Sequence, residues 1–93
     1  NEITLICLLK AIKNLRDIKK CNEIYEYVVQ SNMEMSISLE TSLIDTFSLC
    51  KDIKTAESIF YRMQNKDLIT WTIMINGYVA NNENVRALKL FEE

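Results

Sequence analysis

One pattern of apolar residues occurs twice in this 93-residue sequence, and that repetition constrains the fold more than any other feature. The segment LIDTFSLCKDIKTAESIF, residues 43–60, is matched by MINGYVANNENVRALKLF, residues 74–91. At a constant offset of 31 residues, the matched pairs are Leu43/Met74, Ile44/Ile75, Phe47/Tyr78, Ala56/Ala87, Ile59/Leu90 and Phe60/Phe91. A fainter copy lies 35 residues upstream of the first, at Leu8, Leu9, Ile12, Cys21, Ile24 and Tyr25. Periods of about 20 to 50 residues are typical of proteins built from stacked small units.

Within each copy the apolar residues recur at the spacing of an α-helix. In the middle copy one apolar stripe runs from Leu39 to Phe47, and a second begins after Asp52. The sequence has no Pro and one Gly, which also favours helices over tightly turned strands. Each unit is therefore predicted to be two helices joined by a short turn. We predict an all-α solenoid in which three such units, 2–36, 37–67 and 68–93 (the last one truncated), stack side by side.

Two smaller features also recur between the units. An acidic residue opens each second helix, where its side chain can cap or complement the helix start; these residues are Asp17, Asp52 and Glu83. A small residue recurs at one place in the first helices, at Ala11, Thr46 and Gly77, and at one place in the second helices, at Cys21, Ala56 and Ala87. We expect these small residues to allow the two helices of one hairpin to approach closely.

Composition and motifs argue against several classes of function. The net charge of −2 provides no overall basic field that would hold nucleic acid nonspecifically. The three Cys residues are widely spaced and His is absent, so we expect small core residues and no disulfide framework, metal site or cofactor. No apolar run approaches the about 18 residues needed to cross a bilayer. The sequence offers no nucleophile–base pair or phosphate-binding loop, so no catalytic residue, enzyme activity or small-molecule substrate is predicted.

The segment SLIDTFSLCKDIKTAESIFYRMQNKD, followed directly by LITWTIMINGYVANNENVRALKLFEE, closely resembles the pentatricopeptide repeat family, in particular its plant-type PLS arrays. The ending at residues 63–67 (Met-x-x-basic-Asp) and the following Trp71-x-x-Met74-Ile75 are the most specific parts of the match. The first unit looks like the long variant of these arrays. The sequence also starts at Asn and stops within a helical pattern, and we interpret it as a segment of a longer array.

The sequence departs from the family pattern at the turns. Between the two helices of a unit the family usually has Gly, where this sequence has Arg16, Lys51 and Asn82; near the end of the first unit it has Asn32 instead of Gly. If these turns need a positive φ, side chains other than Gly lower the stability, and Asn does so least.

The resemblance implies binding of single-stranded RNA, with about one base read by each unit. The base-reading positions of the family fall on Thr41 and Asp67 for the middle unit and on Thr72 in the third unit. The positions that hold a base between neighbouring units fall on Ser38 and Ile69. An ionised Asp only accepts hydrogen bonds, and guanine and uracil carry ring N–H donors. Because Thr41 resembles the purine-preferring type, we expect the middle unit to prefer guanine.

Alternatives to this interpretation stay open. Thr41 could be an ordinary surface residue of its helix, and Asp67 could be the cap of the helix that follows. The whole chain could be a protein-interaction solenoid of the tetratricopeptide type, although Thr41, Asp67 and Trp71 favour the RNA-binding family. Trp71 itself is expected to pack between units rather than stack on a base.

The resemblance also implies a place in the cell and a set of partners. Members of the family act mostly in mitochondria or plastids, in RNA processing or editing, and with protein partners in such complexes. PLS proteins often carry a deaminase-like domain after the array, and any such activity would lie outside this segment.

Overall fold

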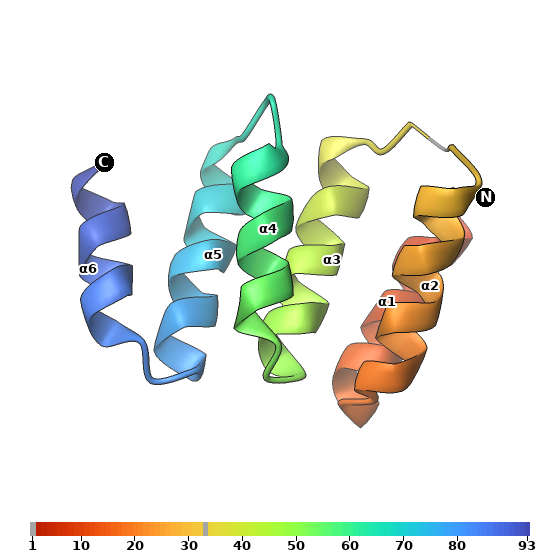
Figure 1. Ribbon diagram of the computed structural model, residues 1–93, viewed down its shortest axis with the longest axis horizontal. Helices are drawn as coiled ribbons and strands as arrows, with labels where there is room; N and C mark the ends of the chain where they lie inside the picture. The colour runs from red at the N-terminus through yellow and green to blue at the C-terminus, as the bar shows by residue number, and fades with distance from the viewer. Residues whose placement is uncertain (1, 33) are drawn as a thin grey trace.

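The computed structural model describes residues 2–32 and 34–93, which form six α-helices and no strand. The helices are α1 (Glu2–Leu15), α2 (Ile18–Gln30), α3 (Ile37–Leu49), α4 (Ile53–Arg62), α5 (Leu68–Ala80) and α6 (Asn84–Glu92). Consecutive helices run antiparallel and form the hairpins α1–α2, α3–α4 and α5–α6 (Figure 1). The predicted all-α solenoid is confirmed.

The hairpins stack in two layers. The first helices pack side by side, with α3 between α1 and α5, and the second helices cover them (Figure 1). Helix α2 contacts both α1 and α3, and α4 contacts both α3 and α5. Each of these second helices therefore lies over the boundary between its own unit and the next one. The hairpin turns lie along one edge of the stack, and the links between units lie along the opposite edge (Figure 1).

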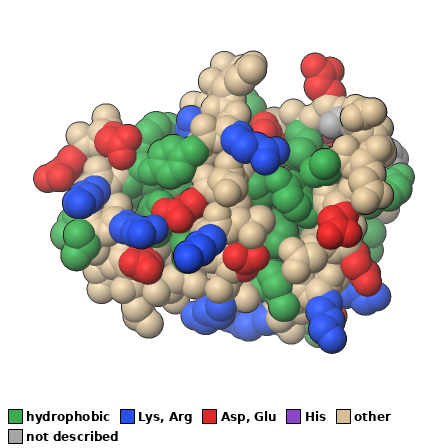
Figure 2. Space-filling view, in the orientation of Figure 1, with side chains coloured by type: hydrophobic (Ala, Val, Ile, Leu, Met, Phe, Trp, Pro, Cys, Tyr) green, Lys and Arg blue, Asp and Glu red, His purple; other side chains and the backbone are tan. Residues whose placement is uncertain are grey.

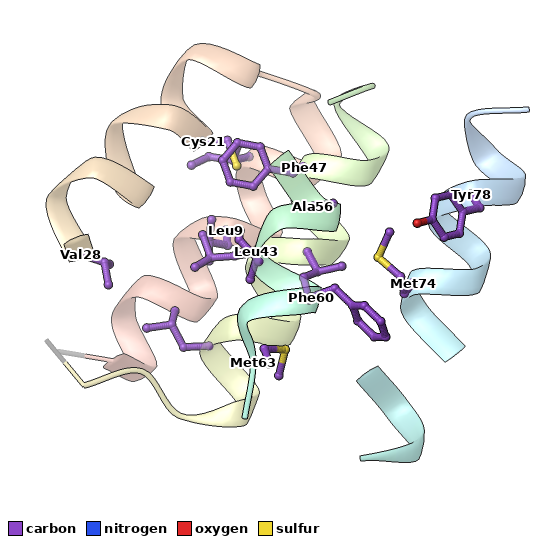
Figure 3. Packing of buried hydrophobic residues seen from close by; sticks show 14 of the residues in the cluster. Leu9, Cys21, Val28, Leu43, Phe47, Ala56, Phe60, Met63, Met74 and Tyr78 are labelled. Atoms are coloured by element: carbon purple, nitrogen blue, oxygen red, sulfur yellow. The ribbon is translucent and has the colours of Figure 1, made fainter. Parts of the chain in front are cut away.

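The repeated apolar positions form one continuous core (Figure 3). In the middle unit the residues with no exposed surface are Leu39, Leu43, Ile44, Phe47, Ala56 and Phe60. Two counterparts in the end units are less covered, because Leu8, which matches Leu43, is 47% exposed and Phe91, which matches Phe60, is 78% exposed, whereas Leu9 and Met74 stay fully buried. Burial at the positions of Leu8 and Phe91 therefore depends on a neighbouring unit.

All three predicted acidic residues lie at helix starts, and two of them cap their helix through a side-chain hydrogen bond. Asp17 and Asp52 are the N-cap residues of α2 and α4, and each accepts a hydrogen bond at Oδ1 from a backbone N–H three residues later, at 3.3 Å. Glu83 occupies the same place before α6 but makes no side-chain cap hydrogen bond. Its carboxylate instead lies 3.9 Å from Arg86 Nε, so it complements the helix start through charge alone.

Two of the small residues of the first helices, Thr46 and Gly77, lie where neighbouring units contact each other rather than within one hairpin, so the prediction was wrong for these two. A Cβ atom at Gly77 in α5 would lie 2.5 Å from Ser48 Oγ and 2.9 Å from Ser48 Cβ, in α3. Thr46 Oγ1 in α3 lies 3.4 Å from the Leu9 carbonyl oxygen in α1. The first helices form the continuous layer, so they must approach one another closely. Ala11, in the first unit, is exposed.

Cys7 also departs from the expectation of a core residue, because it is exposed on α1, which packs against another first helix only on its α3 side. Cys21 is buried, and burial raises the pKa of its thiol to about 12. Cys50 is half-buried.

Among the residues described, no helix combines the length and the apolar character required to span a membrane.

Among the residues that the structure describes, four other than Gly have a positive φ, at the positions that the sequence indicated: Arg16 (54°), Asn32 (55°), Lys51 (71°) and Asn82 (61°). In this left-handed region a Cβ atom crowds the backbone, at a cost of roughly 1–3 kcal/mol for residues other than Gly. Asn tolerates the conformation better than Arg or Lys does. The sequence therefore carries local strain at its three hairpin turns and at Asn32, in the link between α2 and α3.

The two cationic turn residues each reach the following unit. Arg16 Nη1 donates a hydrogen bond to the Leu49 carbonyl oxygen at the end of α3, and Lys51 Nζ donates one to the Ala80 carbonyl oxygen at the end of α5, each at 3.0 Å. A cation is favourable at the carboxyl end of a helix, where backbone carbonyls lack intrahelical partners. Lys and Arg side chains accordingly line the edge that carries the turns, at the bottom of Figure 2. These contacts link consecutive units.

Replacing Lys51 by Gly should raise the free energy of unfolding by about 0.5–1 kcal/mol, because relief of the left-handed strain outweighs the loss of one exposed hydrogen bond. Asn82→Gly, at the same place in the next unit, is the matched control and should change stability by only a few tenths of a kcal/mol. Urea denaturation of the two variants and the parent measures both effects. A less stable Lys51→Gly variant would show that the contact with Ala80 outweighs the strain.

Candidate functional site

The five residues predicted to contact a base lie along one edge of the stack, at the start of α3 and of α5. Ser38 and Thr41 belong to the first turns of α3, Asp67 immediately precedes α5, and Ile69 and Thr72 belong to its first turns. This is the edge that carries the links between units, at the top of Figure 1. Because the hairpins stack in register, consecutive units present their candidate residues next to one another.

Asp67 is the N-cap residue of α5 and is exposed to solvent. Its Oδ1 accepts hydrogen bonds from the Thr70 backbone N–H at 2.9 Å and from the Thr70 hydroxyl at 2.8 Å. These two hydrogen bonds lower the pKa of Asp67 from its ordinary value, so the carboxylate is ionised at neutral pH. The interpretation of Asp67 as a helix cap is therefore correct. Both bonds to Thr70 use Oδ1, so capping does not consume Oδ2.

Thr41 is not an ordinary surface residue, because it is only 8% exposed. Its Oγ1 lies 3.0 Å from Thr70 Oγ1, which joins α3 to α5 across the boundary between two units. Thr41, Thr70 and Asp67 thus form one continuous chain of hydrogen bonds. The structure brings the two reading residues predicted for the middle unit into a single network.

Thr70, which links them, was not among the residues singled out in the sequence. It is fully buried. The local signal for part of its role is present: in Asp67-x-x-Thr70 a Thr three residues after an N-cap Asp can donate both its N–H and its hydroxyl to the cap. The same spacing recurs in Asp52-x-x-Thr55, where the Thr55 hydroxyl donates to Asp52 Oδ2 at 2.7 Å. The contact from Thr70 to Thr41 has no such local signal.

The remaining predicted residues are exposed around this network. Ser38 lies on the first turn of α3, and Ile69 presents an apolar side chain on the first turn of α5. Thr72 is exposed, and its hydroxyl donates a hydrogen bond to the Leu68 carbonyl oxygen at 2.9 Å. Their positions allow contact with a ligand bound along this edge.

Trp71 packs between units, as predicted. Its ring meets the ring of Phe60 edge to face, with the centroids 5.1 Å apart and an interplanar angle of 87°. Phe60 belongs to α4 and Trp71 to α5, so this aromatic pair spans the boundary between the second and third hairpins.

Among residues 2–32 and 34–93, no group of His, Cys, Asp and Glu side chains is arranged to hold a metal ion.

Comparison with known proteins gives consistent results. A family model described as "PPR repeat" matches residues 41–68 and 69–93. Pentatricopeptide repeat-containing protein At1g19720 of Arabidopsis thaliana is 36% identical over 93 residues, which cover 100% of this chain and 10% of that protein. From the same organism, the mitochondrial protein At2g22410 is 36% identical over 77 residues (83% of this chain, 11% of the relative). The chloroplastic protein At1g11290 is 30% identical over 91 residues (98% and 11%). The chain spans about a tenth of the length of these relatives.

Proposed function

Because the chain belongs to the pentatricopeptide repeat family, we propose that it binds single-stranded RNA, reading about one base per unit, and that its middle unit prefers guanine. The observation that carries this proposal is the hydrogen-bonded network of Thr41, Thr70 and Asp67. It holds two reading residues in fixed positions at one unit boundary. A fixed polar pair at the boundary is what selective contact with one base requires.

The chemistry of Asp67 supports guanine over adenine. An ionised carboxylate can only accept hydrogen bonds, and the Thr70 contacts further stabilise this form of Asp67, since they lower its pKa. Guanine offers a ring N–H on its pairing edge, whereas adenine places an acceptor there. Ile69 and Ser38, exposed on the same helix starts, are proposed to hold the base between neighbouring units, with Ile69 providing an apolar surface for the base plane. Thr72 is proposed to read the next base.

The exposure of repeated apolar positions supports the proposal that the chain is a segment of a longer array of units 2–36, 37–67 and 68–93. Leu43 and Phe60 are fully buried in the middle unit, whereas their counterparts Leu8 in the first unit and Phe91 in the last unit are exposed. Phe91 and Trp71 also line an apolar hollow of about 350 Å³ between α5 and α6. A further hairpin stacked against α5 and α6 would cover these side chains.

The names of the relatives support a cellular context. Two of them are named as mitochondrial and chloroplastic proteins. We propose that the protein containing this chain acts in one of these organelles, in RNA processing or editing and together with protein partners. The chain itself is proposed to supply recognition of RNA and no catalytic group.

The chain alone should bind RNA weakly, with a dissociation constant of about 1 mM or more. One or two bases, each contributing about 1–3 kcal/mol of stacking, barely offset the entropy of association. Titration of the ¹⁵N-labelled chain with five-nucleotide RNAs measures this; the central base is varied and the flanking bases are cytosines. Amide shifts should cluster at residues 38–41 and 67–72 and should saturate earliest with central guanine.

Two outcomes of this titration would contradict the proposal. Tight binding to all four RNAs at physiological salt would show that a nonspecific electrostatic surface dominates. An absence of amide shifts with every RNA, in a chain whose spectrum shows that it is folded, would favour a solenoid that binds protein instead.

A further inference from the structure

The hydrogen atoms in the network of Thr41, Thr70 and Asp67 can be assigned from chemistry. The ionised Asp67 has no hydrogen to donate, so the Thr70 hydroxyl must be the donor in the 2.8 Å contact with Asp67 Oδ1. A hydroxyl has a single hydrogen. The 3.0 Å contact between the two Thr hydroxyls must therefore be donated by Thr41 and accepted by Thr70. The direction of donation runs from Thr41 through Thr70 to Asp67.

Burial fixes this direction. Thr70 is fully buried, so water cannot easily replace Thr41 as its hydrogen-bond donor, whereas Thr41 keeps a small exposed surface of 8%. The hydrogen of Thr41 points into the boundary between the units. The lone pairs that Thr41 Oγ1 retains can only accept a hydrogen bond from a ligand. Asp67 Oδ2 can likewise only accept.

Resting on the RNA-binding function proposed above, we propose that Thr70 is a positioning residue that makes Thr41 a hydrogen-bond acceptor, so that both reading side chains accept. A pair of acceptors fits a base whose pairing edge has two adjacent donors. Guanine has such an edge, with its ring N1–H next to its exocyclic amine. Uracil has only one donor there, and adenine has one donor next to an acceptor. Thr70 therefore selects guanine over uracil, which the Asp67 carboxylate alone would not do.

Thr70→Val tests this inference, because it removes the hydroxyl and keeps the shape of the side chain. The backbone N–H of residue 70 still donates to Asp67 Oδ1, so the cap of α5 is retained. Thr41 loses its acceptor, and its hydroxyl can then turn to donate or accept. In the titration with the four five-nucleotide RNAs, the preference for guanine over uracil should fall about fivefold. The pKa of Asp67, followed by carboxyl ¹³C shifts, should rise toward its ordinary value.

Two variants serve as matched controls. Thr70→Ser keeps the hydroxyl and should retain the preference of the parent for guanine. Thr55→Val removes a hydroxyl from the corresponding Asp-x-x-Thr cap at the start of α4, on the opposite edge of the stack. It should lower stability by a similar amount and leave the base preference unchanged. If Thr70→Val does not fold, Thr70→Ala removes the same hydroxyl and does not place a methyl group in its position.

The outcomes separate this inference from the proposed function. A parent chain that binds all four RNAs equally would contradict the guanine-reading function itself. A parent that prefers guanine, combined with a folded Thr70→Val variant that keeps the whole preference, would overturn only the role of Thr70. Equal losses of the preference for guanine over uracil in Thr70→Val and Thr55→Val would also overturn the role of Thr70. The loss would then result from the lower stability of both variants and not from the missing Thr70 hydroxyl.

Discussion

Replacing Asp67 by Asn should move the preference of the middle unit from guanine toward adenine by about 1–3 kcal/mol. Both hydrogen bonds from Thr70 are accepted by Oδ1, so an Asn side chain would keep its carbonyl oxygen there as an ordinary N-cap. Its amide group would then replace Oδ2. One acceptor would become a donor, and a donor can meet the ring nitrogen of adenine that the carboxylate repels. Thr41 would keep its direction of donation.

The measurement uses the same four five-nucleotide RNAs at one fixed salt concentration. Asp52→Asn is the matched control, because Asp52 caps α4 at the opposite edge of the stack and should not influence the base. Both variants should remain folded, since Asn caps a helix about as well as Asp does. Equal weakening of binding to all four RNAs by Asp67→Asn would show that Asp67 serves only as a cap.

Gly77→Ala should lower the free energy of unfolding by about 1–3 kcal/mol. The new Cβ would lie within 3 Å of both side-chain atoms of Ser48. Ser48 cannot easily move its hydroxyl away, because the hydroxyl donates a buried hydrogen bond to the Ile44 carbonyl oxygen at 2.7 Å. Helices α3 and α5 must therefore separate. This result would oppose helix propensity, which favours Ala over Gly by about 1 kcal/mol within a helix.

A second substitution distinguishes the clash from other causes. Ser48→Gly removes both atoms that the new Cβ meets. In a chain that carries Ser48→Gly, adding Gly77→Ala should therefore lower the free energy of unfolding much less than it does in the parent. Asn76→Ala, at an exposed position of the same helix, should be neutral or slightly stabilising. Urea denaturation of this set measures the coupling. A Gly77→Ala variant more stable than the parent would contradict the close packing of α3 against α5.

The fold could be predicted from the sequence because its signals are local. The helical spacing around Leu43 and Phe47, and its recurrence at a fixed offset, indicate stacked hairpins without any knowledge of their contacts. The positive φ of Lys51 was also predictable, since the position follows a helix end. The contact of Gly77 with Ser48 could not be predicted, because it depends on how α3 and α5 pack. A repeated small residue indicates a close approach without identifying the partner helix.

The candidate site shows the same division between local and tertiary information. Asp67 as a cap follows from its place before an apolar stripe, and Thr41 and Asp67 as a pair follow from the family resemblance. Thr70 could not be connected with Thr41 from the sequence, because the two hydroxyls are 29 residues apart and meet only when two units stack. The burial of Thr41 likewise arises from that stacking.

The polar ties between units have a mechanical consequence. At the boundary between the second and third hairpins, the bond from Lys51 to Ala80 holds the rim with the turns, and the bond from Thr41 to Thr70 holds the opposite rim. Opening the stack at either edge requires breaking one of these hydrogen bonds, so the boundary between the two hairpins resists bending in both directions. For the RNA binding proposed above, this rigidity would hold the base-reading positions of consecutive units at a fixed distance, so stretching a bound strand would also strain the protein.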